Sequence, residues 1–404
     1  MKKWIIVAAF ASAILAGCTK NEVRVDVPDQ AISFQTIVGK NSTKALVSGT
    51  EYPTDVPFGT VAWYLEPGKN WAANRADAVP YIGVNSNGVV AGVEVDYSQD
   101  GNYWKTEDDY FWPKSGSLTF FSFSPYETDF VCNLTDGLTI SGWDVKSSDA
   151  DNDNQSKDLM IAFKADQTAN QSYANYNGVP TKFMHILSYI KGFTIKTDKD
   201  YSNGHDGTQG KEYKVGDMKD FTITNVSIRN IFEKADFKSG IALASHADMT
   251  GWSNHDANSV ADYTWFGGTA SGTPFANSAT SIVPNKLYNN NEYLLVLPQD
   301  FANEGDADDP MIVIEYSYKY YNGITGEGKD GWIKINSGEV TKNLYDIHTD
   351  QDNAWDMNKA ITYNLTISFT GGNPDDPDNP NSDLIFWAPD VMDWAAESHD
   401  DIVM

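Results

Sequence analysis

Short runs in which apolar and polar residues alternate recur along the chain from about residue 31 onward. A period of two is typical of a β-strand that buries one face. In the first run, that face carries Ile32, Phe34, Thr36 and Val38. Similar runs follow at Gly59 to Leu65, Leu118 to Phe123, Leu159 to Phe163, Ile186 to Ile195, Phe221 to Ile231, Tyr293 to Leu297, Met311 to Tyr321 and Ile361 to Phe369.

Clusters of Gly, Asn, Asp and Pro separate these runs, and no long stretch repeats its apolar residues every 3.6 positions. Many strands without interleaved helices favour antiparallel sandwiches over a parallel α/β sheet. A length of 404 residues exceeds what one compact core usually holds, so two domains are expected. The polar segment from Thr197 to Met218 is the expected junction, which predicts sandwiches at residues 45–205 and 206–370.

The first residues indicate export. Lys2 and Lys3 precede a short apolar run that is too short to span a bilayer and fits a secretory signal. Leu15-Ala16-Gly17-Cys18 looks like a bacterial lipobox, in which the cysteine sulfur receives a lipid. Acyl chains would anchor the protein firmly, because each buried CH₂ contributes roughly 0.8 kcal/mol. We therefore predict a signal peptide at residues 1–17 and lipidation of Cys18; the alternative is an ordinary secretion signal with a chance cysteine.

The last residues combine a linker with an apolar segment. Residues 371–383 read GGNPDDPDNPNSD, a composition that cannot continue a sheet ladder. After this linker come apolar positions that include Leu384, Phe386, Val391 and Trp394. Something must cover these side chains, so residues 371–404 are predicted to be a tether with a candidate strand.

Charge excludes one class of partner. The chain has 56 acidic against 29 basic residues, a net charge of −27, and such a surface repels phosphate backbones. Nucleic-acid binding is therefore not expected. If Cys18 carries lipid, Cys132 is the only thiol left, and its apolar neighbours indicate a buried small hydrophobe.

Candidate chemistry is sparse. The six histidines are scattered without metal-ligand spacing, and no nucleophile elbow or phosphate-binding loop occurs. Asp149, Asp151 and Asp153 open like a calcium loop, but Met160 stands where a bidentate Glu is needed. We predict no catalytic residue, no metal and no cofactor, hence no enzyme. Aromatic residues such as Trp63, Trp71 and Trp104 would support a surface glycan-binding lipoprotein only if they were exposed.

The order of several motifs resembles a known family. These are the lipobox, Ala31-Ile-Ser-Phe-Gln-Thr-Ile-Val38 followed by Ser42-Thr-Lys-Ala45, Phe58-Gly-Thr-Val-Ala-Trp-Tyr64, Asn102-Tyr-Trp104, Tyr110-Phe-Trp-Pro113, Leu118-Thr-Phe-Phe-Ser-Phe-Ser-Pro-Tyr126, Asp158-Leu-Met-Ile-Ala162, Phe183-Met-His-Ile-Leu-Ser188, Leu297-Pro-Gln299, Ile361-Thr-Tyr-Asn-Leu-Thr-Ile367 and Val391-Met-Asp-Trp394. Together they resemble the fimbrillin (Mfa-like and major fimbrillin) lipoproteins of Bacteroidetes, and the resemblance covers nearly the whole chain.

The resemblance implies two tandem transthyretin-like sandwiches in a pilus subunit that supports adhesion. In such proteins the lipoprotein precursor reaches the outer membrane, and a trypsin-like protease cuts after a basic residue. The first strand is then lost, and the C-terminal segment of an identical or related subunit fills the groove. The surface ligand is not identified by the sequence.

Carried over to this chain, the cut falls between Lys44 and Ala45 and removes residues 18–44 with the first strand. Leu384, Phe386, Val391 and Trp394 are then the candidate donor residues. The best-known cleavage site of the family carries Arg rather than Lys, so an uncut, lipid-anchored base subunit stays open, and so does a tip subunit. The linker is also compatible with a simple excursion before a last intramolecular strand.

Overall fold

A computed structural model describes residues 31–37, 52–85, 88–126, 128–145, 157–170, 172, 178–197, 213–214, 217–243, 248–267, 273–274, 280–282, 294–301, 309–349, 352–369, 382–386 and 390–393. Within these ranges the chain is nearly all β, which confirms the all-β expectation. The helical elements with described bounds are single turns: α1 (Trp71–Asn74), the 3₁₀ turn η1 (Arg75–Asp77) and α3 (Leu344–Ile347). No described helix is long and apolar enough to cross a membrane.

The first large sheet has nine strands in the order β10-β1-β5-β4-β2-β6-β9-β11, with β3 beside β2. Its members are β1 (Phe34–Ile37), β2 (Phe58–Leu65), β3 (Val79–Ile82), β4 (Val93–Ser98), β5 (Tyr103–Thr106), β6 (Ser117–Ser124), β9 (Met160–Gln167), β10 (Val179–Lys182) and β11 (Met184–His185). Only Phe183 separates β10 from β11, although they end opposite sides of the order. The sheet must therefore curl until its two ends meet.

A core fills the inside of this curl. It contains Phe34, Phe58, Trp104, Phe120 and Val179, which come from five different strands of the sheet. The outer face of β2 and β6 carries a second apolar layer that includes Trp63 and Phe123. Strands β2 and β6 thus bury both faces, which is why their sequences read as nearly continuous apolar runs.

A four-stranded sheet, in the order β15-β14-β8-β7, covers that second layer. Its strands are β7 (Val131–Asn133), β8 (Gly137–Asp144), β14 (Lys234–Lys238) and β15 (Gly251–Ser253). Strands β14 and β15 belong to the second predicted domain span, yet β14 pairs with β8 of the first, and β15 joins the same sheet through β14. The division at residues 205 and 206 stays a prediction, and the chain crosses between the two halves of the molecule more than once.

Most of the remaining described strands form two sheets that face each other across one core. One has the order β18-β12-β24-β25, with β19 beside β12 and β26 beside β24. It contains β12 (Ser188–Thr197), β18 (Thr280–Ile282), β19 (Leu294–Val296), β24 (Lys359–Phe369), β25 (Ser382–Phe386) and β26 (Asp390–Asp393). The other has the order β16-β13-β21-β22, with β17 beside β13, and contains β13 (Met218–Phe232), β16 (Val260–Gly267), β17 (Thr273–Pro274), β21 (Met311–Gly326) and β22 (Lys329–Asn343).

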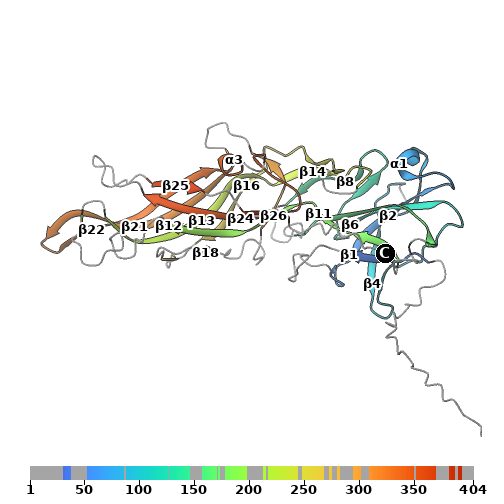
Figure 1. The fold of residues 1–404 in the computed structure, drawn as a ribbon, viewed down its shortest axis with the longest axis horizontal. Helices are drawn as coiled ribbons and strands as arrows, with labels where there is room; N and C mark the ends of the chain where they lie inside the picture. Colours follow the sequence, from blue (N-terminus) through green and yellow to red (C-terminus); the bar gives the residue numbers. More distant parts are fainter. Residues whose placement is uncertain are drawn as a thin grey trace, which may run out of the picture.

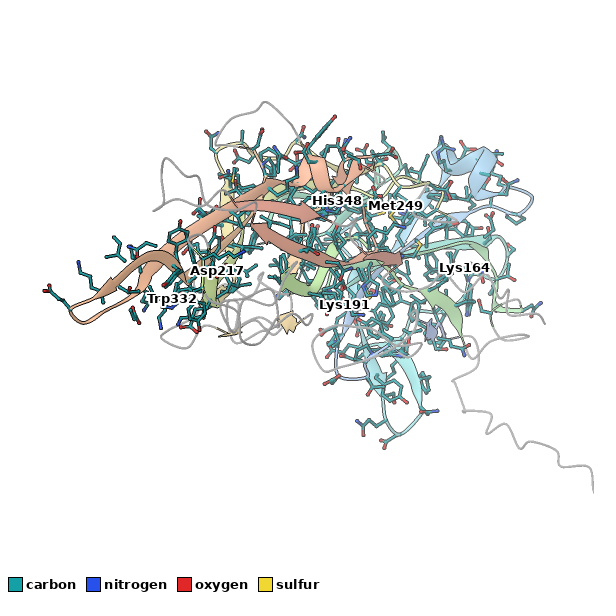
Figure 2. All side chains as sticks on the ribbon, turned by 60° about the vertical axis from the view of Figure 1, so that its left-hand side comes forward. Lys164, Lys191, Asp217, Met249, Trp332 and His348 are labelled. Carbon is teal, nitrogen blue, oxygen red and sulfur yellow. The ribbon has the colours of Figure 1, made fainter. Side chains whose placement is uncertain are left out.

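A short pair, β20 (Gln299–Asp300) and β23 (Ala354–Trp355), completes the strands. The run from Met311 to Tyr321 lies within β21, and its alternate positions Ile312, Ile314, Tyr316 and Tyr318 are all buried. Figure 1 shows an elongated molecule with the curled sheet at one end and the β21–β22 hairpin reaching out at the other. In Figure 2, Trp332 lies on this hairpin, whereas Lys164 lies in the opposite half.

Candidate functional site

The first strand sits between two neighbours. β1 runs parallel to β10, with Phe34 opposite Val179 and Ile37 opposite Lys182. On its other side it pairs with β5 at one position, where Phe34 faces Trp104. The attachment to β5 is therefore short, and most of the strand's register is set by β10.

Backbone hydrogen bonds hold the residues just before β1. The Ile32 amide donates to the Tyr110 carbonyl at 2.7 Å, and the Val179 amide donates to the Ser33 carbonyl at 2.7 Å. Ala31 makes an isolated antiparallel bridge with Phe111. These contacts tie residues 31–33 to segments that lie far away in the sequence.

Two side chains of this strand enter the core of the curled sheet. Ile32 is 4% exposed and Phe34 is 1% exposed. The Phe34 ring stands nearly perpendicular to the rings of Phe58 and Phe120, with centroids 5.7 Å from each. Edge-to-face pairs of this kind add about 0.5–1.5 kcal/mol to the burial of apolar area. The expected inward positions Ile32 and Phe34 are thus core residues, whereas Thr36 is half-buried.

The walls around Phe34 are contributed by segments other than β1. Tyr52 stacks on Phe183 at 4.7 Å and meets Trp104 edge-on at 5.2 Å. The Tyr52 hydroxyl and the Ser124 hydroxyl share a 2.6 Å hydrogen bond inside the core. These aromatic walls hold one another, so their arrangement does not depend on β1 alone.

Gly178 sets how closely the first strand approaches. Its φ of +141° lies in a region that side-chain-bearing residues rarely adopt, and a Cβ there would stand 2.5 Å from the Ser33 carbonyl oxygen. The sequence did not reveal this residue or the strand β10 that follows it, because pairing between parallel strands so far apart leaves no local pattern.

The tail pairs with its own chain. β25 and β26 run antiparallel along β24, with Leu384 opposite Ile367, Phe386 opposite Leu365 and Val391 opposite Ile361. Leu365 and Ile361 are each 1% exposed. β25 has a described neighbour on one side only and also contacts β22. The described tail is thus the last strand of its sheet rather than an interior one.

Several predicted residues lie outside the described part of the chain. They are Cys18, Val38, Lys44, Ala45 and Trp394. Lipidation, cleavage after Lys44 and the role of Trp394 therefore stay predictions. The acidic loop at residues 149–153 also lies outside the described ranges, and Met160 begins β9 as a buried residue.

Two described side chains with possible chemical roles, Cys132 and His185, are enclosed. Cys132 is buried, it accepts a 3.4 Å contact from Trp63 Nε1, and burial raises the pKa of its thiol to about 12. His185 is buried and its Nδ1 lies 2.9 Å from Asp158 Oδ1. No group of three or more His, Cys, Asp or Glu among the described residues could hold a metal ion.

The aromatic residues considered for glycan binding are also internal. Trp63, Trp71 and Trp104 are 5%, 2% and 4% exposed. Sugar rings stack on exposed aromatic faces, so this burial removes the main support for the glycan-binding alternative.

Comparison with known protein families shows which family the chain belongs to. The family model described as fimbrillin-like matches residues 69–377, well over half of the chain. The chain belongs to the fimbrillin-like family. This is a family of fimbrial structural subunits rather than of enzymes.

Individual relatives of this family member are distant. Residues of the fimbrium subunit Fim1C from Phocaeicola vulgatus are 25% identical over 207 positions, which cover 48% of this chain. The chain spans about half the length of this curated relative, 51%. A fimbrial protein from Bacteroides vulgatus has a solved structure with a TM-score of 0.49 and 16% identity, covering 88% of this chain and 99% of its own. A fimbrilin from Porphyromonas gingivalis W83 gives a TM-score of 0.36 and 12% identity over 89% of this chain and 97% of its own.

Proposed function

We propose that this fimbrillin-like chain is a structural subunit of a cell-surface pilus that supports adhesion and assembles by exchanging strands between subunits. Family membership and the fimbrial name of its curated relative support a pilus role. The observation that carries the exchange mechanism is the setting of the first strand. It precedes Lys44 in the chain, pairs with β5 at one position, and inserts Ile32 and Phe34 into an aromatic core whose walls come from other segments.

In this proposal the precursor is exported as an outer-membrane lipoprotein through Cys18, and its two halves are transthyretin-like sandwiches. A trypsin-like protease cuts between Lys44 and Ala45. The cut releases the lipid together with β1, because β1 precedes the cut in the chain. Burial of a large apolar side chain contributes about 1.5–3 kcal/mol, so loss of Ile32 and Phe34 leaves a groove that strongly favours refilling.

The tail of a second subunit then fills this groove. Leu384 and Phe386 are two positions apart, as are Ile32 and Phe34, so one extended segment can present two apolar side chains on one face. In its own subunit β25 has one described neighbour, β24. In the groove a donor strand gains two neighbours, β5 and β10, and hence more backbone hydrogen bonds.

The exchange is thus favourable only after the resident strand has gone. The intact precursor keeps its groove filled and its tail on β24, which prevents premature assembly. An uncut subunit keeps its lipid and its first strand, so it cannot accept another subunit and ends the growth of the filament. An anchor subunit would therefore be a chain that is not cleaved. Partners are then identical or related fimbrillins.

The proposal is tested on filaments sheared from a Bacteroidetes host that produces this chain. We expect N-terminal sequencing to find Ala45 as the first residue, and electrophoresis to show ladders that resist SDS. A Lys44→Gln variant is expected to stay monomeric and membrane-bound. Ladders built from chains that retain β1, or fully cleaved chains that stay monomeric at high concentration, would overturn the exchange mechanism.

A further inference from the structure

An exposed apolar patch lies beside the entrance of the first strand. Phe111 is 50% exposed, Val79 is 53% exposed and Tyr81 is 36% exposed. The Tyr81 hydroxyl donates a 2.6 Å hydrogen bond to the Phe111 carbonyl, so the patch has a fixed shape. The Phe111 backbone bridges Ala31, which places the patch directly at the start of the β1 site.

This patch has an acidic border. Glu107, Asp108 and Asp109 are exposed and precede Phe111 by two to four positions. The Asp108 carbonyl accepts a 2.7 Å hydrogen bond from the Thr106 hydroxyl, which fixes the turn that carries these carboxylates. The surface is therefore an aromatic knob with negative charge along one side.

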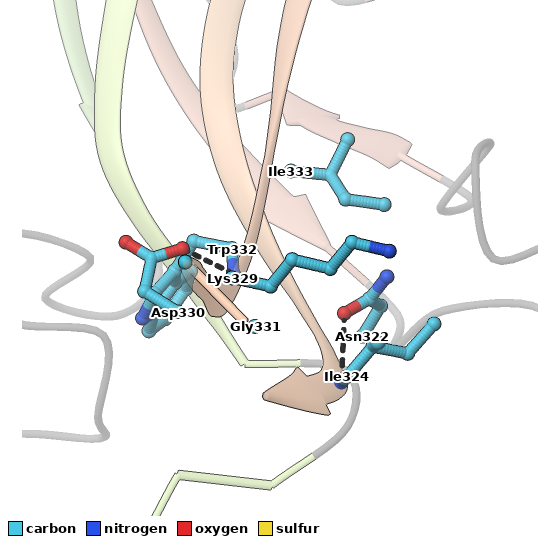
Figure 3. A pocket seen from close by; sticks show the side chains of 8 residues that line it. Asn322, Ile324, Lys329, Asp330, Gly331, Trp332 and Ile333 are labelled. Carbon is cyan, nitrogen blue, oxygen red and sulfur yellow. Dashed lines mark hydrogen bonds between the residues drawn. The ribbon is translucent and has the colours of Figure 1, made fainter. Parts of the chain in front are cut away.

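The opposite end of the molecule carries a hollow. It lies at the tip of the β21–β22 hairpin, has a volume of about 360 Å³, and includes Ile324, Ile333, Asn322 and Lys329 in its lining. Figure 3 shows these four side chains on one side of the hairpin, with Asp330 and Trp332 directed to the other. A cavity of about 150 Å³ holds a benzene ring, so this hollow has room for a phenylalanine side chain.

The hollow offers an apolar side chain and a positive charge, which are complementary to the aromatic patch around Phe111 and to its acidic border. Ile324 is 56% exposed and supplies apolar surface to the hollow. Lys329 is also exposed and lies on the wall of the hollow. Its positive charge is complementary to the carboxylates at residues 107–109, in a chain whose net charge is −27.

The far side of the hairpin tip is stiffened by an aromatic cluster. Trp332 packs against Tyr321 at 5.1 Å and against Tyr213 at 5.0 Å, and Lys219 Nζ lies 4.0 Å from its ring centroid. The hollow is therefore presented on a braced hairpin rather than on a loose loop, which reduces the ordering cost of docking.

We infer that Phe111 of one subunit docks into the hairpin hollow of a second copy of this chain, between Ile324 and Ile333, with Lys329 facing Asp108. This inference rests on the proposed strand exchange and adds a second contact to the same junction. The knob borders the acceptor groove, and β22, which leads into the hollow, contacts the donor strand β25. A knob and a hollow at opposite ends of one molecule make a head-to-tail contact that repeats without closing, which is the geometry of a filament.

The contact is tested by photocrosslinking in the full chain. The photoreactive residue p-benzoylphenylalanine replaces Phe111, and the chain is produced in the pilus-forming host. We expect crosslinks between position 111 and residues 322–333 of another copy. As a matched control, the same group replaces Val260, which is 48% exposed on β16, and is expected to give no crosslink to the hairpin tip.

Charge exchange supplies an independent readout. Asp108→Lys and Lys329→Glu are each expected to lower the yield of ladders about two- to fivefold, the range for an exposed ion pair, and the double variant is expected to restore it. Phe111→Ala is expected to lower the yield about tenfold. Normal ladders with crosslinks elsewhere, or single charge variants without effect, would overturn this contact and leave strand exchange standing. An unsubstituted chain that forms no ladders would overturn both.

Discussion

The Ser33 carbonyl oxygen lies so close to Gly178 that a Cβ on Gly178 would stand 2.5 Å from it. Real Cβ atoms essentially never come so near to an oxygen, and neither group can rotate away, because both belong to the backbone. The absence of a side chain at Gly178 therefore allows the backbone of β1 to approach this closely. Any strand that occupies the site in the Ser33 register must pass this point with its main chain.

Gly178→Ala is expected to loosen β1 specifically. The added methyl group opposes the Ser33 carbonyl, and the φ of +141° is unfavourable for alanine, so we expect a loss of more than about 1 kcal/mol of unfolding free energy. Hydrogen exchange should show faster exchange at residues 33–37 than in the unsubstituted chain. Gly68→Ala is the matched control, because Gly68 has a φ of +82° with no atom within 4 Å of a built Cβ. Equal exchange at β1 in both variants would contradict the role of Gly178.

Phe34→Ala is expected to destabilise the uncut chain by about 3–5 kcal/mol. The phenyl ring is 1% exposed and contacts Phe58 and Phe120 edge-on, so its removal leaves a cavity in a rigid aromatic core. Chemical denaturation measures the loss. Thr36→Ala on the same strand is the control and should change stability by less than about 0.5 kcal/mol, since Thr36 is half-buried. Similar costs for the two variants would show that Phe34 is not the anchor of β1.

The sequence alone predicted the positions of the strands better than it predicted which strands pair with one another. Alternation identified the first strand and the strand β21, because a buried strand face leaves a period of two in the residues themselves. It also placed Ile32 and Phe34 on one face of that strand; both are buried, and so is Ser33 between them. These features are local, so they can be read from a few consecutive residues.

The partners of those elements could not be predicted in the same way. β1 pairs with β10, about 145 positions later, and β14 leaves the second sandwich to pair with β8. Pairing over such distances depends on which edges the fold exposes, and no residue pattern near β1 or β14 records it. Gly178 is an example. From the sequence, a glycine in a polar stretch predicts a turn, and only the position of β1 in the fold shows that Gly178 contacts the Ser33 backbone.

Cys132 is expected to resist thiol reagents in the folded protein. Burial raises the pKa of its thiol to about 12, so at pH 8 only on the order of one molecule in 10,000 carries the reactive thiolate. In a Cys18→Ser variant, Cys132 is the sole thiol, and a colorimetric disulfide reagent should detect none until denaturant is added. Full reaction within minutes in native buffer would contradict the burial of this cysteine.

The join between β8 and β14 is expected to weaken in acid. The Asp236 carboxylate accepts hydrogen bonds from Asn254 Nδ2 at 2.8 Å and from the Gly142 amide at 2.7 Å, and these bonds lower the pKa of Asp236 below its usual 3.8. Because the folded state binds this proton less readily than the unfolded state, the contribution to stability is complete above pH 3.8 and is lost as pH falls through the lowered pKa.

Asp236→Asn should therefore unfold at lower denaturant concentration than the unsubstituted chain at pH 7, and the two midpoints should converge as the pH falls below 3.8. Asp55→Asn makes the same change of charge at an exposed residue and is expected to leave the midpoint unchanged at both pH values. A gap between Asp236→Asn and the unsubstituted chain that is equally large at pH 7 and pH 3 would show that the variant acts through packing. Convergence of the two midpoints would instead show that the Asp236 carboxylate stabilises the pairing of β8 with β14. Asp236 on β14 accepts a hydrogen bond directly from the Gly142 amide of β8.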